Sequence, residues 1–223
     1  MLINMRNGLM AGKRLPYDAE VEYLESTGTQ YIDIGSLPAG STDGGTIDIE
    51  FYIEHDVGYR SIWGSGGYGT QAINLYFNSS IKSTDLTWCR GAYFTAKVFD
   101  VNKWFRQRFE TASKTTLTIT GDSGTLATHE FNNPVAGNYT LFKYSGSSYA
   151  GQEGLRIRSF RTTGCYGLRD FIPVRFTNEY GQTEGAMFDR ANPTVGMNPD
   201  GSARTDGLYR NRGTGAFTYG NDI

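Results

Sequence analysis

The sequence is poor in the residues that bind transition metals or crosslink a fold. Its 223 residues include two cysteines, two histidines and six prolines. No CxxC pair and no His/Cys cluster occurs, which argues against a zinc site. Cys89 and Cys165 lie far apart in the chain, and spacing alone does not place their Cα atoms within disulfide reach. We favour two free, partly buried thiols, and a disulfide stays the open alternative.

The sequence also lacks an excess of one charge and any long apolar run. The formal net charge is −2 without a basic stripe, so we expect no nucleic-acid partner. No segment approaches membrane-spanning length, so we expect no membrane insertion. Residues 4–8 interrupt the N-terminal apolar residues before a signal-peptide core forms. This leaves a cytosolic protein, a chain without its leader, or a protein released by lysis within a particle; we expect an extracellular or virion-associated setting.

Glycine and aromatic residues are abundant instead. The chain has 29 glycines, 14% aromatic residues and 20% charged residues, the composition of short strands joined by tight loops. Apolar and polar residues alternate over residues 46–54, and shorter alternations occur at 117–119 and 155–157. Glycine-containing turn signals separate such segments. We therefore predict an all-β chain that folds as one antiparallel β-sandwich of two sheets.

One segment has an ambiguous pattern. Residues 92–120 contain neither glycine nor proline, and Val101, Phe105 and Phe109 share a helical spacing. Asn102 and Lys103 form a plausible turn, however, and residues 111–120 are rich in β-branched side chains, which favour strands. We predict a hairpin here.

The N-terminal segment differs from the rest of the chain. Residues 1–18 carry irregularly placed apolar side chains and end near Pro16, where a helix or strand is interrupted. We predict an N-terminal arm over 1–18 and one domain over 19–223. The arm docks on a partner, as in a homo-oligomer or particle, or on its own sandwich; a disordered tail is the alternative.

Two ends of the sequence resemble a known fold family. Residues 22–33 (EYLESTGTQYID) resemble the opening strand of laminin-G-like, concanavalin-type jelly-roll domains of gut-bacterial surface proteins and of phages and prophages. Residues 155–160, 168–175, 185–189 and 209–218 resemble the closing pattern of the same family. The resemblance implies a jelly roll but no particular ligand. Residues 191–206 look longer than the usual turn, and we interpret them as a tolerated insertion.

A catalytic interpretation rests on residues 46–51. This strand resembles the EIDIEF strand of jelly-roll β-glucanases, and Thr46 stands at the nucleophile position. Retaining hydrolysis needs two carboxylates, and a hydroxyl without a base does not replace one. Asp48 and Glu50 share a strand face about 6.7 Å apart, which keeps an inverting β-glucanase as a distant alternative. We predict that the chain is not an enzyme.

Glycan binding is the functional interpretation that we favour. Sugars stack on exposed aromatic rings while polar groups bind their hydroxyls, and a candidate platform combines Tyr52, Trp63 and Tyr68 with Asp48 and Glu50. The alternative is that such rings fill the core.

Anion and metal sites have weaker support. Several arginines fall on or near neighbouring predicted strands, and we interpret them as solvent-facing positions in preference to an anion site; they are Arg156, Arg158, Arg161, Arg169 and Arg175. Aspartates near turns could supply calcium ligands, but no DxDxDG loop occurs, so we predict no metal and no cofactor.

The sequence thus predicts a non-enzymatic recognition or assembly module. Its partner would be a glycan or a surface protein, and its setting a bacterial surface or a phage-like particle. The alternative is a purely structural virion subunit that oligomerises through residues 1–18.

Overall fold

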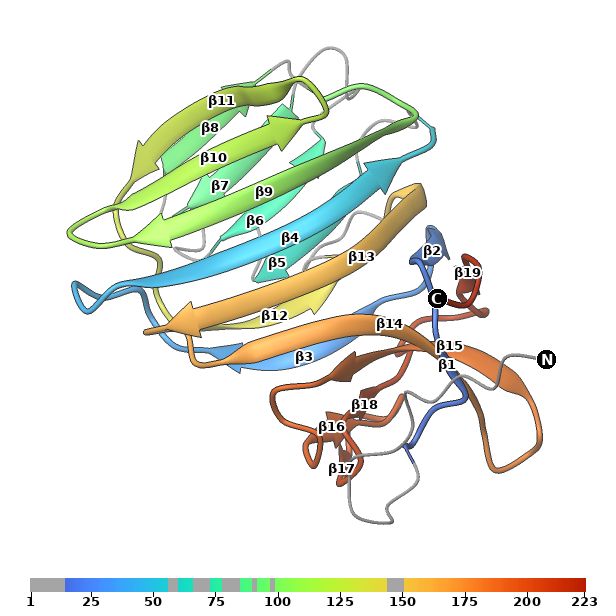
Figure 1. Cartoon of the computed structure of the whole chain (residues 1–223). Helices are drawn as coiled ribbons and strands as arrows, with labels where there is room; N and C mark the ends of the chain where they lie inside the picture. The colour runs from blue at the N-terminus through green and yellow to red at the C-terminus, as the bar shows by residue number, and fades with distance from the viewer. Residues whose placement is uncertain are drawn as a thin grey trace.

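The structure is a computed structural model that describes residues 15–55, 60–65, 73–77, 85–89, 92–96, 99–143 and 151–223. The described residues form strands and loops, without a helix. They build two sheets that pack face to face, as Figure 1 shows. The predicted antiparallel two-sheet β-sandwich is therefore confirmed. No helix in the described ranges is long and apolar enough to cross a membrane.

The larger sheet faces the viewer in Figure 1. Its main path has the order β11-β10-β9-β4-β13-β14-β15-β18-β16-β17, and β1, β2 and β19 pair at its side. The strands are β1 (Ala19–Glu20), β2 (Leu24–Thr27), β4 (Gly45–Ile53), β9 (Lys103–Thr111), β10 (Thr115–Gly121), β11 (Gly124–Phe131), β13 (Glu153–Gly164), β14 (Arg169–Thr177), β15 (Thr183–Asp189), β16 (Gly196–Met197), β17 (Ala203–Arg204), β18 (Leu208–Tyr209) and β19 (Thr218–Tyr219).

The smaller sheet lies behind it in the order β3-β12-β5-β6-β7-β8. Its strands are β3 (Ile32–Leu37), β5 (Ser61–Ser65), β6 (Asn74–Phe77), β7 (Asp85–Cys89), β8 (Ala92–Ala96) and β12 (Gly137–Leu141). Neighbouring strands pair antiparallel within both sheets, except for the short parallel contact of β16 with β18.

The main core fills the space between the two sheets. Strand β4 shows how the sequence builds it: Ile47, Ile49, Phe51 and Ile53 are fully buried. The residues between them face the outside of the sheet, as the period of two requires. Trp63 of β5 lies in the same core.

The segment 92–120 forms strands, and a turn lies at Asn102 as predicted, but this turn does not close the hairpin. Asn102 has φ +60°, a left-handed conformation that asparagine tolerates well. The chain leaves β8 of the smaller sheet before this turn and enters β9 of the larger sheet after it. The hairpin is β9–β10, closed where the Ala112 amide donates to the Lys114 carbonyl.

Strands β13 and β14 pair only over a short length. Their register ends at Phe160 opposite Phe171, and the other half of β13 pairs with β2. Beyond that point β14 pairs with β1, where Glu20 is opposite Val174. Pro173 lies just past the end of the β13 pairing, where its missing N–H costs no bond to β13. The two strands separate toward the side of β1, β2 and β19 (Figure 1).

The described end of the predicted arm packs on the sandwich. The Tyr17 ring lies 5.0 Å from that of Phe188, and the Asp18 amide donates to the Arg175 carbonyl at 2.9 Å. Tyr17 covers a second, smaller apolar cluster, which consists of Ile172, Val174, Phe176, Ala186, Phe188 and Leu208. Residues 1–14 lie outside the described residues, so the predicted assembly role of the arm stays a prediction.

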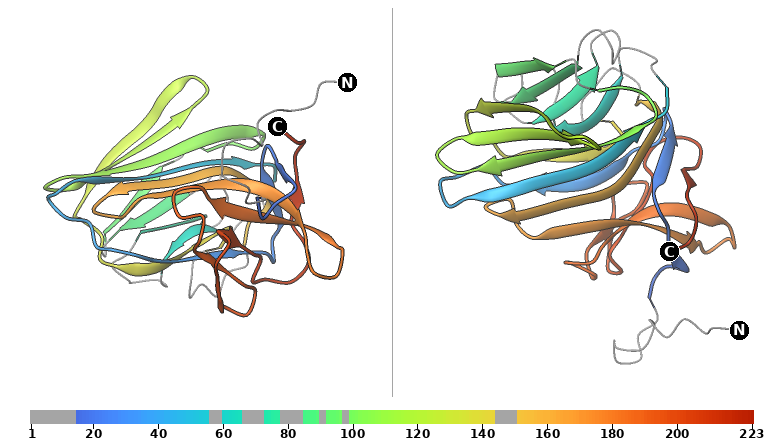
Figure 2. Two further views of the ribbon diagram at one scale, coloured as in Figure 1. Left: turned by 60° about the horizontal axis from the view of Figure 1, so that its bottom comes forward. Right: turned by 45° about the horizontal axis from the view of Figure 1, so that its top comes forward.

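Residues 191–206 form a loop with its own small strands. β16 and β17 pair within it, Gly196 opposite Arg204. The loop lies with the other C-terminal strands at one end of the sandwich, as the orange and red ribbons of Figure 2 show.

Candidate functional site

Cross-strand register places polar and aromatic side chains in rows on the outer face of the larger sheet. Opposite Tyr52 of β4 lie Trp104 of β9 and Arg156 of β13. Arg156 is in turn opposite Glu25 of β2. Directly opposed residues bring their Cβ atoms within about 5 Å, so these four side chains form one row across four strands.

The rings in this row are held in place by arginines. The Tyr52 and Trp104 ring centroids are 5.5 Å apart, and Tyr23, just before β2, lies 6.3 Å from Trp104. The Arg156 guanidinium lies 4.7 Å from the ring centroids of both tyrosines. Such cation–π contacts stabilise the rings by about 0.5–1 kcal/mol each at exposed sites. We call Tyr23, Tyr52, Trp104 and Arg156 the ring row.

A β-bulge adds one more arginine to this face. The pairing of β13 with β4 shifts register between Ile157 and Ser159, so Arg158 has no direct partner on β4. A bulge of this kind redirects a side chain. Arg158 here lies over the Trp104 ring at 4.5 Å and pairs with Glu50. Arg158 thereby connects the ring row with Glu50 on the same outer face.

The carboxylates of β4 are neutralised by arginines. Asp48, 8% exposed, accepts from Arg106 through Nε, 2.9 Å from both carboxylate oxygens, and through Nη2 at 2.5 Å. It also accepts a longer hydrogen bond of 3.3 Å from Arg108. The hydrogen bond to Asp48 raises the pKa of Arg106. Burial lowers the pKa of Arg156, but its hydrogen bond to Glu25 and the nearby charges of Glu25 and Glu54 together outweigh this, so the net shift is upward. The outer face is therefore a surface of paired charges with aromatic rings between them.

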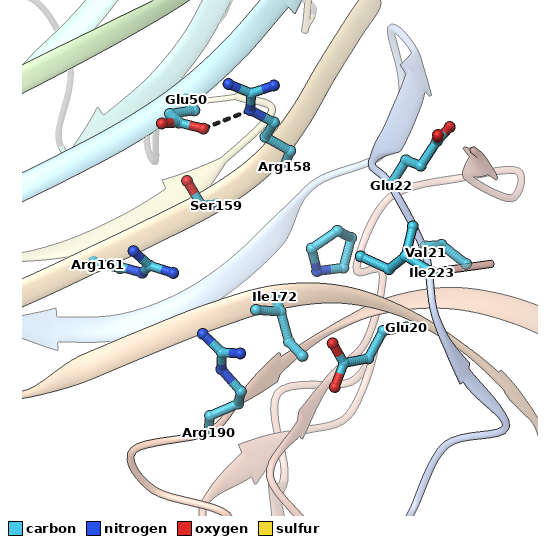
Figure 3. A pocket seen from close by; sticks show the side chains of 11 residues that line it. Glu20, Val21, Glu22, Glu50, Arg158, Ser159, Arg161, Ile172, Arg190 and Ile223 are labelled. Carbon is cyan, nitrogen blue, oxygen red and sulfur yellow. Dashed lines mark hydrogen bonds and ion pairs between the residues drawn. The ribbon is translucent and has the colours of Figure 1, made fainter. Parts of the chain in front are cut away.

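A depression of about 300 Å³ opens where β13 and β14 separate. Figure 3 shows arginine side chains on one side of it and apolar side chains with two carboxylates on the other. It is lined by Glu20, Val21, Glu22, Glu50, Arg158, Ser159, Arg161, Ile172, Pro173, Arg190 and Ile223. Because Arg158 and Glu50 also lie beside the ring row, the depression continues the same surface.

The structure brings together three of the five predicted platform residues. Asp48, Glu50 and Tyr52 share the outer face of β4, and the half-buried Tyr52 ring lies outside the core as predicted. Tyr68 lies outside the described residues.

The prediction that Trp63 is exposed is wrong. Its side chain is fully buried, its ring packs edge-on against Phe109 and Phe160, and its Nε1 donates to Oε1 of Gln107 at 2.8 Å. Every residue of β5 is buried, so the glycine-rich neighbourhood of Trp63 leaves no open ring face. A platform of Tyr52, Trp63 and Tyr68 therefore does not form.

Sequence reasoning missed Tyr23 and Trp104. Trp104 belongs to a strand with strict alternation, in which Phe105, Gln107 and Phe109 are buried. Phe105 and Phe109 also fit a helical spacing, and because of this ambiguity the sequence pattern did not place Trp104 on the outer face of a strand. Tyr23 lies just before β2, where no alternation of apolar and polar residues indicates on which side of the sheet its ring lies.

Each of the five arginines pairs with a carboxylate, and the prediction that they face solvent does not fit Arg169, whose side chain is 20% exposed. Arg156, Arg158 and Arg161 lie on the outer face, and each pairs with a carboxylate. Arg169 binds the buried Asp189, and Arg175 binds Asp222.

The thiol and metal predictions are covered only in part. Cys165 is a free, half-buried thiol, and the side chain of Cys89 lies outside the description. Within the described ranges, no three His, Cys, Asp or Glu side chains gather as a metal-ligand set.

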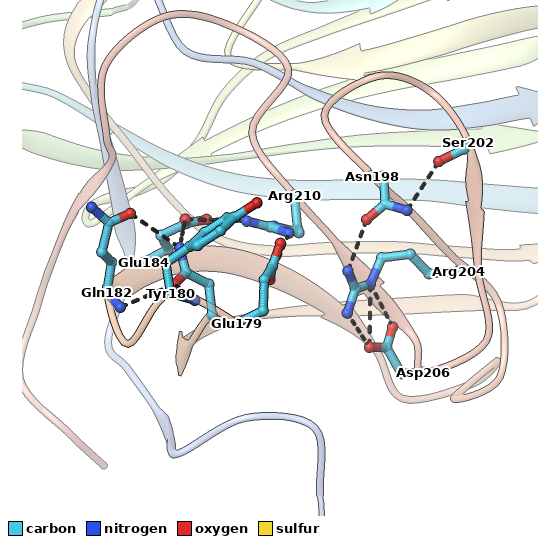
Figure 4. Close-up of polar contacts among 10 residues, drawn as sticks. Glu179, Tyr180, Gln182, Glu184, Asn198, Ser202, Arg204, Asp206 and Arg210 are labelled. Atoms are coloured by element: carbon cyan, nitrogen blue, oxygen red, sulfur yellow. Dashed lines mark hydrogen bonds and ion pairs between the residues drawn. The ribbon is translucent and has the colours of Figure 1, made fainter.

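A second polar cluster lies at the C-terminal end (Figure 4). Arg210 donates to both Glu184 oxygens, at 3.1 and 3.0 Å, and stacks on Phe176. Arg204 pairs with Asp206 and donates to Oδ1 of Asn198 at 2.8 Å. These contacts fix the 191–206 loop and the β14–β15 hairpin, so we assign the cluster a structural role.

No protein-family model matches the sequence, and no curated protein matches it. The fold is similar to several solved structures. Domains LG4–5 of the mouse laminin α1 chain align with 17% identity and a TM-score of 0.42 over 68% of this chain and 43% of theirs. A proposed carbohydrate binding protein from Bacteroides ovatus aligns with 10% identity and a TM-score of 0.46, over 75% of this chain and 58% of that one.

The enzymatically active domain of tailspike protein 2 of bacteriophage CBA120 aligns with 10% identity and a TM-score of 0.41 over 71% of this chain and 30% of that one. The alignments thus span less than two thirds of each of these three proteins. One of these solved structures is a pair of laminin G domains, the kind of domain that the two ends of the sequence resemble. At these identities the similarity concerns the fold alone and carries no information about ligand or activity.

Proposed function

We propose that the chain is a non-enzymatic glycan-recognition module, exposed on a bacterial surface or a phage-like particle. The ring row carries the proposal. Its half-buried aromatic rings lie beside one another on an outer sheet face, fixed by arginines and bordered by carboxylates. Rings that are already ordered lose little entropy when a sugar stacks on them.

The same face does not support glycoside hydrolysis. The Thr46 hydroxyl is hydrogen-bonded to that of Thr163 at 2.9 Å, and a hydroxyl without a base is a poor nucleophile. Asp48 binds two arginines, and Glu50 binds Arg158. A general acid must reach the glycosidic oxygen of the substrate, and here both carboxylates are engaged by guanidinium groups.

Replacing the central ring tests the proposal. Trp104→Ala should weaken retention on a glycan array by about fivefold or more, since a stacked ring contributes on the order of 1 kcal/mol. Tyr180→Ala is the matched control, because Tyr180 is 81% exposed at the tip of the β14–β15 hairpin. Full retention by both Trp104→Ala and Tyr52→Ala would show that the ring row is not the binding surface.

A purely structural subunit is the second candidate. The burial of Trp63 favours it, since one of the three predicted stacking rings belongs to the core. In that case the wild-type protein retains no glycan on the array, and its mass in solution corresponds to a closed oligomer.

A further inference from the structure

The depression between β13 and β14 has a surplus of positive charge on one wall. Arg158, Arg161 and Arg190 line it there. Their carboxylate partners are Glu50, bound to Arg158, and Asp170, which serves both Arg161 and Arg190. Three guanidinium groups therefore share two carboxylates on this wall.

Arg161 keeps donors that no neighbour uses. It donates to Oδ1 of Asp170 through Nε alone, at 2.8 Å. In the part of the chain that the structure describes, no acceptor is bonded to its Nη atoms, and its side chain is 57% exposed. Arg190 approaches the other Asp170 oxygen through Nε at 2.9 Å and Nη2 at 2.7 Å. Asp170 thus orients both guanidinium groups, and Figure 3 shows the two arginine side chains at the edge of the depression.

The opposite side of the depression has a different character. Ile172, Pro173 and Ile223 provide apolar surface there. Two carboxylates complete it: Glu20 accepts from the Tyr17 hydroxyl, and Glu22 accepts from the Asn221 amide. A ligand with an anionic group therefore fits in one orientation only, with that group toward the arginines.

We propose that the depression binds the carboxylate of an acidic sugar residue, and that Arg161 and Arg190 recognise it. A guanidinium group matches a planar carboxylate through two parallel N–H donors. The volume of about 300 Å³ lies at the lower end of the range of ligand pockets, which suits one sugar residue. The next sugar residue of the glycan would lie past Arg158, on the ring row.

This inference rests on the proposed function and names its ligand class. Two sources share the chemistry, a uronic acid within a polymer and a terminal sialic acid. Both have neutral counterparts of nearly the same shape. Trigalacturonate and its methyl ester form one matched pair of probes, and 3′-sialyllactose and lactose form the other.

The experiment measures the binding of these four probes by titration calorimetry. We expect at least one acidic probe to bind about tenfold or more tightly than its neutral counterpart, with a preference that falls as salt screens the charges. The pair that shows the preference identifies the source. The double variant Arg161→Gln with Arg190→Gln should lose the preference for the acidic probe. The single variant Arg161→Lys should keep only part of this preference, because lysine lacks the planar guanidinium fork.

Arg175→Gln is the matched control. Arg175 of β14 likewise pairs with a carboxylate, Asp222, but it does not line the depression. The Arg175→Gln variant should bind all four probes like the wild type. Thermal melting of each variant confirms that it is folded.

The outcomes separate this inference from the proposed function. Equal binding of acidic and neutral probes that is lost in Trp104→Ala overturns the inference and leaves the proposed function intact. An acidic preference that survives the double variant also overturns it. No binding of any probe, together with no retention on a glycan array, overturns both.

Discussion

At the scale of single residues, Trp63 is the largest fully buried side chain in the described part of the chain. It is fully buried among Phe109, Tyr139 and Phe160, with ring centroids 5.8–6.2 Å away. Its indole N–H is satisfied by Gln107 from the facing sheet. Packing and a buried hydrogen bond thus join the two sheets at one point.

Trp63→Ala should therefore lower the free energy of unfolding by about 3–5 kcal/mol, the usual cost of removing a large buried ring. Urea denaturation followed by circular dichroism measures the change. Trp104→Ala is the matched control and should cost much less, because Trp104 stands on the outer face. Equal losses for the two variants would contradict the difference in their burial.

The aromatic residues show how far the sequence predicts the direction of a single side chain. Tyr52 could be placed outside the core because β4 alternates strictly, and the structure confirms it. The pattern of β5 has no polar alternation, since even Ser61 and Ser65 are buried, so nothing in the sequence signals where Trp63 points. The aromatic neighbours Tyr23 and Trp104 depend on pairing between distant strands, which a local pattern does not contain.

At the scale of elements, Tyr17 connects the segment before β1 to β15. Its hydroxyl donates to Oε1 of Glu20 at 3.2 Å. Burial, and then the neighbouring carboxylate of Glu20, raise the pKa of Tyr17 from 10.0 to about 12. The folded protein thus favours the neutral phenol.

This shift predicts a loss of stability at alkaline pH. A raised pKa in the folded state contributes stability that is complete below the pKa of the unfolded chain and disappears as pH rises through the folded value. The free energy of unfolding should fall between about pH 10 and about 12, and less steeply in Tyr17→Phe. Denaturation curves across this range test it, with the exposed Tyr180→Phe as control. Identical slopes for wild type and Tyr17→Phe would refute the role of Tyr17.

The closing turn illustrates which elements the sequence specifies well. Gly215 has φ +72°, a left-handed conformation that glycine adopts readily. A Cβ on Gly213 would lie 1.9 Å from the Thr29 carbonyl oxygen, which excludes any side chain there. By contrast, the turn at Asn102 was correctly located but joins two sheets, because a local turn signal does not say which strands will pair.

At the scale of the whole molecule, the fold was predictable and the site was predictable only in part. Alternation, turn residues and composition all point to a two-sheet sandwich, and consistent local signals of this kind define a fold. The outer surface depends instead on the bulge at Arg158 and on the separation of β13 from β14. Both arise from long-range pairing, so the depression has no counterpart in the sequence pattern.

The predicted arm can be divided at the point where the described structure begins. Tyr17 and Asp18 contact the sandwich, so deleting residues 1–14 preserves all of these contacts and should leave the melting temperature unchanged. Deleting residues 1–18 removes the cover of the smaller apolar cluster and the bond to Arg175, and should lower it by several degrees.

The same two deletions test assembly when the mass is measured by light scattering. If the arm joins subunits, the 1–14 deletion reduces the oligomer to a smaller species, and any accompanying change in melting temperature depends on protein concentration. A stable domain with unchanged mass would place the subunit contacts on the sandwich. A loss of stability on removing residues 1–14 that is the same at every protein concentration would instead make the arm part of the fold, because stabilisation by assembly depends on protein concentration.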